Sequence, residues 1–198
     1  MNVIQKRDIE KAQESIVTAI NPSKRIKDLE KRLKFSETFE NKVALADAYL
    51  DEKMFNEAIE HYQGSLKDVF KNDFYVLTKL QEAYYYTSKF KDSIATAERI
   101  IDNPSFKKSR SSFLYGMALE KNGDLKKAEV FLRNFDAPYN YFMERLELAR
   151  FLVRINKIED GKGVYQEMVN ESENMSKQNL RNNRHLIKKA KEELNQLS

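Results

Sequence analysis

The chain has 198 residues, 33% of them charged, and its 35 Lys and Arg exceed its 31 Asp and Glu to give a formal net charge of +4. It contains five Gly, three Pro and no Cys. This composition favours helices joined by short turns, and it excludes disulfides, thiolate metal sites and cysteine nucleophiles.

Charge is distributed unevenly along the chain. Residues 41–140 carry fifteen basic and fifteen acidic side chains, whereas residues 175–198 carry six basic and two acidic. Proteins that bind nucleic acid usually concentrate positive charge over their main surface. Only the C-terminal end is therefore a candidate for that role.

The first 36 residues are predicted to form two helices separated at Pro22. Ser23 is expected to cap the second of them, over residues 24–35. Neither region has the apolar core of a signal peptide, and no run approaches the roughly 20 apolar residues that span a bilayer, so the sequence predicts a cytoplasmic protein. The apolar residues of the two helices are Ile4, Ile9, Ala12, Ile16 and Val17 over residues 3–18, then Ile26, Leu29 and Leu33.

Four related segments follow between residues 38 and 171. Large, small and large residues lie at positions i, i+1 and i+4, with Gln81 at the middle position in the second segment, which places them on one stripe of a first helix. A polar turn follows, and then a small residue on a second helix, where close packing of the two helices demands it. The second-helix residues Ala58, Ser93, Ala128 and Gly161 recur at intervals of 35, 35 and 33. The first-helix stripes are Leu45, Ala46 and Tyr49; Leu80, Gln81 and Tyr84; Tyr115, Gly116 and Leu119; and Leu148, Ala149 and Leu152.

The last predicted element is a helix over residues 179–197, expected to cap the open end of the final repeat. Its expected apolar side consists of Leu180, Leu186 or Ile187, Ala190, Leu194 and Leu197.

With this period and these residues, the segment 38–171 resembles tetratricopeptide repeats. The resemblance implies an all-α, right-handed superhelical solenoid of four helical hairpins, at about residues 38–71, 73–105, 107–137 and 140–171. A helical segment over residues 1–36 would precede the repeat domain 37–172, and a basic capping helix would occupy 173–198. The function implied is that of a non-catalytic protein–protein interaction scaffold.

A concave groove lined by the first helices is the surface where such repeats bind a peptide or protein segment. The groove predicted here would be acidic at one end, aromatic in the middle and basic at the other end. Aromatic residues would anchor an amphipathic or extended partner, and the charges would set its direction. Helical spacing nominates Val43, Asp47 and Asp51; Tyr75, Thr78, Glu82, Tyr85 and Tyr86; Phe113, Met117 and Glu120; and Leu146, Arg150 and Arg154.

Several of these residues have a second interpretation. Tyr75, Phe113 and Met117 equally fit packing between hairpins, because aromatic stripes at helical spacing are usually core. The run Tyr84-Tyr85-Tyr86 spans too much of a helix to share one face, so at least one of the three is expected in the groove or at the surface.

The C-terminal helix provides an alternative function, the binding of nucleic acid or of an anionic membrane surface. A solvated cap face explains its charge equally well. No aromatic residue interleaves with the cations to stack on bases, which disfavours nucleic acid. The basic residues are Lys177, Arg181, Arg184, His185, Lys188, Lys189 and Lys191.

Signals for catalysis are weak. The two histidines, His61 and His185, show no metal-ligand spacing, and the sequence has no phosphate-binding glycine loop and no nucleophile elbow. We therefore predict no enzyme activity, no metal and no cofactor. A hydrolytic enzyme would require a pocket that combines His61 with convergent carboxylates. The expected partner is a protein or peptide of unknown identity, and the sequence leaves a homo-oligomer open.

Residues 23–49, together with the helix that contains Arg181-Asn182-Asn183-Arg184, also resemble the soluble part of bacterial membrane-anchored tetratricopeptide-repeat proteins. In those proteins an apolar helix precedes the repeats, and this sequence begins without one. The resemblance leaves open an upstream anchor that would tether a longer form to the inner membrane.

Overall fold

The computed structural model describes residues 22–197, which form helices joined by turns, with no strand among them. The prediction of an all-α fold is confirmed. The chain divides into two compact units, Met1–Ile100 and Ile101–Ser198, referred to below as the N-terminal and the C-terminal unit. The helix predicted over residues 3–18 lies outside the described residues.

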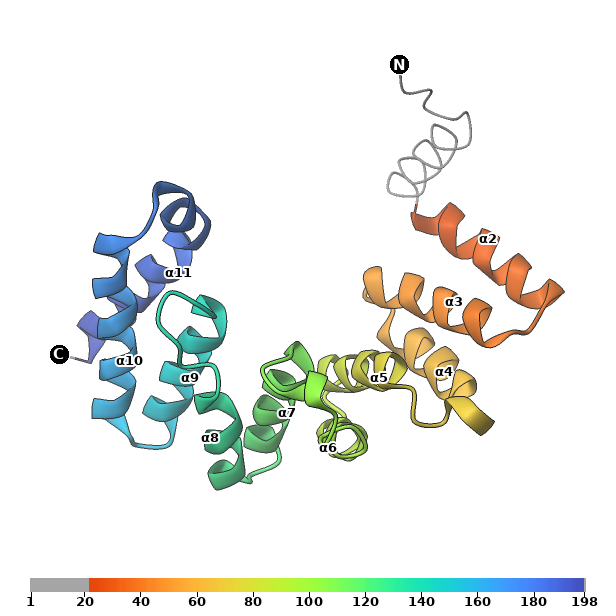
Figure 1. The fold of residues 1–198 in the computed structure, drawn as a ribbon, viewed down its shortest axis with the longest axis horizontal. Coiled ribbons are helices and arrows are strands. Elements are labelled where there is room, and N and C mark those ends of the chain that lie inside the picture. The colour runs from red at the N-terminus through yellow and green to blue at the C-terminus, as the bar shows by residue number, and fades with distance from the viewer. Residues whose placement is uncertain (1–21, 198) are drawn as a thin grey trace, which may run out of the picture. The chain divides into compact units, whose positions relative to one another are not determined.

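Within the described residues, the N-terminal unit contains a leading helix and two helical hairpins (Figure 1). The expected start of the leading helix needs correction: it begins at Pro22, whose fixed φ and missing N–H suit a first turn, and Ser23 lies inside that turn. Side-chain caps precede both first helices, since Thr38 accepts from the backbone N–H of Asn41 and Asp73 from that of Val76. The helices are α2 (Pro22–Phe35), α3 (Phe39–Asp51), α4 (Phe55–Ser65), α5 (Phe74–Tyr86) and α6 (Phe90–Glu98).

The C-terminal unit contains two further hairpins and a final helix (Figure 1). The final helix begins two residues earlier than expected, because the Ser176 side chain caps it by accepting from the backbone N–H of Asn179. The helices are α7 (Arg110–Lys121), α8 (Leu125–Arg133), α9 (Phe142–Arg154), α10 (Ile158–Glu171) and α11 (Lys177–Gln196).

The small residues of the repeat lie where the two helices of each hairpin cross. Ala58, Ser93 and Ala128 are 0% exposed. The Ser93 hydroxyl donates to the backbone carbonyl of Gln81 at 3.2 Å, so α5 and α6 approach each other at that position. Small side chains are what allows the approach.

Both ends of the described chain carry a covering helix. In the N-terminal unit, Ile26 of α2 is buried in the core of the first hairpin, and Leu29 and Leu33 pack against that core. In the C-terminal unit, Ile187 and Ala190 of α11 are buried. Leu180, seven residues before Ile187, was expected on this buried side but is 37% exposed near the start of α11.

Candidate functional site

The predicted groove residues of the N-terminal unit lie on the first helices α3 and α5. We call them the N-terminal first-helix face, and all of them are at least partly exposed: Asp47, Asp51, Tyr75, Thr78, Glu82, Tyr85 and Tyr86. Four of the α5 members follow helical spacing, because Tyr75, Thr78, Glu82 and Tyr86 are separated by three, four and four residues. The helix therefore turns one continuous side outward.

Asp47 connects the two first helices of this face. Its carboxylate accepts a hydrogen bond from the hydroxyl of Tyr75 on α5 at 2.9 Å and from the buried hydroxyl of Tyr62 on α4 at 2.5 Å. Burial, followed by the hydrogen bond to Asp47, raises the pKa of Tyr75 to about 12. At neutral pH the Tyr75 hydroxyl is therefore a permanent donor, and Asp47 holds the ring in one position.

Tyr75 remains accessible although it is held in place. The side chain is 47% exposed, and the Lys79 ammonium group lies 5.6 Å from its ring centroid. Asp51, at the end of α3, pairs with Arg25 of α2 at 2.8 Å. The face thus combines an oriented aromatic ring with carboxylates of Asp47 and Asp51, a combination suited to binding an apolar or cationic side chain.

The three consecutive tyrosines occupy three different environments. Tyr84 is buried and its hydroxyl accepts from the Gln63 side chain at 2.6 Å. Tyr85 is partly buried, and Tyr86 is 44% exposed while its ring stacks on Phe55 at 5.1 Å between centroids. Tyr86 therefore extends the accessible aromatic surface at the C-terminal end of α5.

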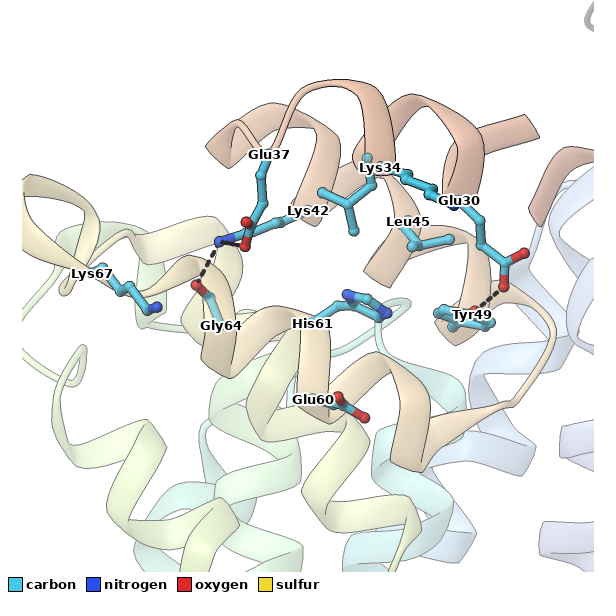
Figure 2. Close-up of a pocket in the computed structure, with 11 residues that line it drawn as sticks. Glu30, Lys34, Glu37, Lys42, Leu45, Tyr49, Glu60, His61, Gly64 and Lys67 are labelled. Atoms are coloured by element: carbon cyan, nitrogen blue, oxygen red, sulfur yellow. Dashed lines mark hydrogen bonds and ion pairs between the residues drawn. The ribbon is translucent and has the colours of Figure 1, made fainter. Parts of the chain in front are cut away.

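A second feature of the N-terminal unit is a cleft of about 640 Å³ between α2, α3 and α4, which Figure 2 shows. At one end the Tyr49 hydroxyl donates to Glu30 at 2.7 Å, and at the other end Lys42 pairs with Glu37 at 2.8 Å. Burial, with the bond to Glu30 second, raises the pKa of Tyr49 to about 12. The hydrogen bond from Lys42 lowers the pKa of Glu37.

This cleft contains His61, the histidine that a hydrolytic site would require. The imidazole stacks on the Tyr49 ring, with centroids 5.5 Å apart, while Glu30 and Glu37 bond to Tyr49 and Lys42. A general base must lie within hydrogen-bond reach of the proton that it removes. Within residues 22–197, none of the hydrogen bonds between the residues that line this cleft includes His61.

In the C-terminal unit, three of the predicted groove residues are buried, and one of them, Leu146, is 2% exposed. Phe113 is 5% exposed and Met117 is 7% exposed. The Phe113 ring lies edge-to-face against Phe135, with centroids 5.4 Å apart. In this structure Phe113 and Met117 take the packing role that the sequence left open.

The charged groove residues of the C-terminal unit form ion pairs with one another or with other residues of the unit. Arg154 of α9 bonds to Glu120 of α7 at 2.7 and 2.9 Å. Arg150 bonds to Glu147 at 2.5 Å and to both oxygens of Glu193 on α11. The basic end of the predicted groove is therefore paired with carboxylates of the same unit.

Arg150 and Arg154 also line one pocket of about 580 Å³ between α9, α10 and α11. Tyr165 of α10 donates to Glu193 at 2.7 Å at its edge, and burial, with this bond second, raises the Tyr165 pKa. The hydrogen bond from Arg150 is the main cause that lowers the Glu193 pKa. The pocket therefore presents fixed charges of both signs.

Sequence reasoning missed the most buried ionic cluster of the C-terminal unit. Arg145 on α9 is 0% exposed, and its guanidinium reaches Glu171 at 2.8 Å, Asp136 at 3.1 Å and Glu167 at 3.1 Å. Glu171 also accepts from the backbone N–H of Tyr139 at 2.8 Å, which fixes the loop before α9. The carboxylates at 167 and 171, four apart on α10, were the one sequence signal for this cluster.

Residues 22–197 contain no group of three or more His, Asp or Glu side chains that could hold a metal ion. Across the same residues, no helix is both long enough and apolar enough to cross a bilayer.

Comparison with known proteins supports the fold. No protein-family model matches the chain, and no curated protein matches it. Two solved structures of MamA, a protein with tetratricopeptide repeats, are similar to it at 13% identity and a TM-score of 0.73. One is MamA from residue 41 to the end, from Desulfovibrio magneticus RS-1, matched over 84% of this chain and 94% of that one. The other, MamA RS-1 ArsTM double mutant, is matched over 83% and 93%. At this identity the likeness establishes a tetratricopeptide-type fold alone.

Proposed function

We propose that the chain is a non-catalytic protein-interaction scaffold that binds a peptide or protein segment on its first-helix residues. The fold favours this role because stacked helical hairpins present extended surfaces and few enclosed pockets. In the N-terminal unit the binding residues are those of the first-helix face. In the C-terminal unit they are Glu120, Arg150 and Arg154, whose paired charges orient the bound segment.

One observation carries the proposal: Tyr75 is fixed by Asp47 and is still 47% exposed. Binding hot spots are enriched in tyrosine, and a ring that is already held in place loses little freedom when a partner covers it. Asp51 lies on the same face, where it pairs with Arg25, and its negative charge acts on the Tyr75 hydroxyl. The bound segment is therefore expected to pair an apolar group with a cationic one.

The test uses a displayed library of random peptides, selected on the full chain and read by sequencing. Peptides that are enriched on the native chain are synthesised, and their affinities are measured by calorimetry for the native chain and for Tyr75→Ala. We expect at least about a tenfold loss of affinity for Tyr75→Ala, as for a typical aromatic hot spot. Tyr75→Phe keeps the ring but loses the bond to Asp47, so an intermediate loss is expected.

Tyr139→Ala is the matched control, because Tyr139 is 48% exposed and lies outside the first helices. It should bind the selected peptides as the native chain does. Equal affinities for the Tyr75 and Tyr139 variants, with circular dichroism unchanged, would show that the first-helix face is not the binding surface.

A further inference from the structure

One side of α11 carries a straight row of five cations: Lys177, Arg181, Arg184, Lys188 and Lys191. We call it the basic row. The residues are spaced by four, three, four and three positions, which keeps them on one face of a helix. All five side chains are exposed. With a rise of about 1.5 Å per residue, the row is roughly 21 Å long.

The side of α11 opposite the row, which carries Ala190 and Glu193, is anchored to the C-terminal unit, and Ile187 is buried at the edge of the row. Ala190 is buried, and Glu193 accepts hydrogen bonds from Arg150 and Tyr165. The helix therefore cannot rotate to hide its cations. The basic row is held pointing away from the core of its own unit.

The charge of the row is barely neutralised by its own helix. Within residues 22–197, the ion pair recorded for a row residue joins Lys188 to Glu192 at 3.5 Å, and these side chains are 77% and 55% exposed. Such an exposed pair contributes little. The row thus presents close to its full positive charge to a ligand.

A partly exposed apolar side chain borders the row, on the same edge as the buried Ile187. Leu180, 37% exposed, is three residues after Lys177 and four before Arg184, so it is next to both on the helix surface. An amphipathic helix at a bilayer surface combines cations at the headgroups with leucines at the acyl boundary. A phosphate backbone of nucleic acid offers nothing for such a leucine to contact, and the row contains no aromatic residue to stack on bases.

We infer that the basic row is a docking site for the anionic headgroups of a lipid bilayer surface, separate from the proposed protein-binding face. Clusters of four to eight Lys and Arg on a helix bind anionic lipid, and each cation near the surface strengthens binding about fivefold. Charges exposed to solvent are screened over about 10 Å at 0.1 M salt. Binding should therefore weaken steeply as salt rises.

The experiment is co-sedimentation of the full chain with vesicles. Vesicles of phosphatidylcholine that contain phosphatidylglycerol should bind the chain at low salt, and vesicles of phosphatidylcholine alone should not. Arg184→Glu/Lys188→Glu should weaken binding by about tenfold or more, because each reversal removes a positive charge and adds a negative one. Leu180→Ser should weaken it by a few-fold.

Lys126→Glu/Lys189→Glu is the matched control. It changes the net charge equally at two exposed residues of the same unit, and Lys189 is about 100° around the helix from Lys188. This variant should keep at least half of the native binding. If both double variants lose vesicle binding equally, binding depends only on net charge, and the basic row is not a specific docking site.

Two further outcomes would also overturn the inference. One is the absence of binding to phosphatidylglycerol vesicles, which would make the row a solvated cap face. The other is tight binding of a single-stranded RNA oligonucleotide that is lost in Arg184→Glu/Lys188→Glu and kept in Leu180→Ser, with no vesicle binding. Peptide binding at Tyr75 is measured separately, so failure of one site leaves the other testable.

Discussion

At the scale of single residues, Gly161 shows how little room the hairpin crossing leaves. A Cβ atom at this position would lie 2.8 Å from Cγ2 of Val153 and 2.9 Å from the backbone carbonyl oxygen of Ala149. The Val153 methyl group can rotate away, but the carbonyl belongs to α9 itself. Any side chain at Gly161 must therefore push α10 away from α9.

Gly161→Ala should lower the free energy of unfolding by about 1 to 3 kcal/mol, because overpacking outweighs the better helix propensity of alanine. Gly163→Ala is the control on the same helix. A Cβ there would have nothing within 4 Å, so this change should raise the free energy of unfolding by about 0.5 to 1 kcal/mol. Urea denaturation followed by circular dichroism measures both. If the two variants shift stability in the same direction, the crossing is not tightly packed.

At the scale of the elements, all four first helices end in the same way. The second residue after each helix end has a positive φ, at 59° for Lys53, 58° for Ser88, 90° for Gly123 and 65° for Asn156. In each case the next residue donates its backbone N–H to the carbonyl five positions earlier, as Lys89 does to Tyr84 at 2.9 Å. This is the Schellman motif, which usually places glycine at the left-handed position.

Ser88→Gly should therefore raise the free energy of unfolding, by about 0.5 to 1 kcal/mol, because serine is strained in a left-handed conformation and glycine is not. Gly123→Ala, the reverse change in the third hairpin, should lower it by about 1 kcal/mol, although the site has open space around it. Thermal unfolding of the two variants gives the comparison. A lower melting temperature for Ser88→Gly would contradict the motif.

At the scale of the whole molecule, the sequence predicts what depends on local periodicity and misses what depends on the register between hairpins. The helix pairs follow from the repeat of small residues such as Ala128. The bonds from Tyr75 to Asp47 and from Arg154 to Glu120 join residues 28 and 34 positions apart, so they depend on how consecutive hairpins stack. The burial of Arg145 depends instead on contacts within one hairpin, to Glu167 and Glu171 on α10, and on Asp136 in the preceding loop.

Ionic contacts are concentrated in the C-terminal unit. Arg145 is fully buried with three carboxylates, and Arg150 joins α9 to Glu193 on α11. Removing one partner of such a cluster is costly, because the remaining charge stays in a poorly solvated position. The final helix, which carries the basic row, is therefore held in part by a bond that acid can break.

The hydrogen bond from Arg150 lowers the pKa of Glu193 in the folded chain. This hydrogen bond stabilises the folded chain fully above about pH 4.3, the pKa of a glutamate in the unfolded chain. The stabilisation is lost as pH falls through the lower pKa that Glu193 has in the folded chain, because the unfolded chain takes up the proton first. Amide exchange of peptides from α11, relative to peptides from α5 in the same sample, should accelerate as pH falls below about 4.3. Glu193→Gln should accelerate this exchange at least about fivefold at neutral pH and flatten its dependence on acid. Glu192→Gln, at an exposed neighbour, should leave the profile as in the native chain, and a similar change in both variants would mean that Glu193 does not hold α11.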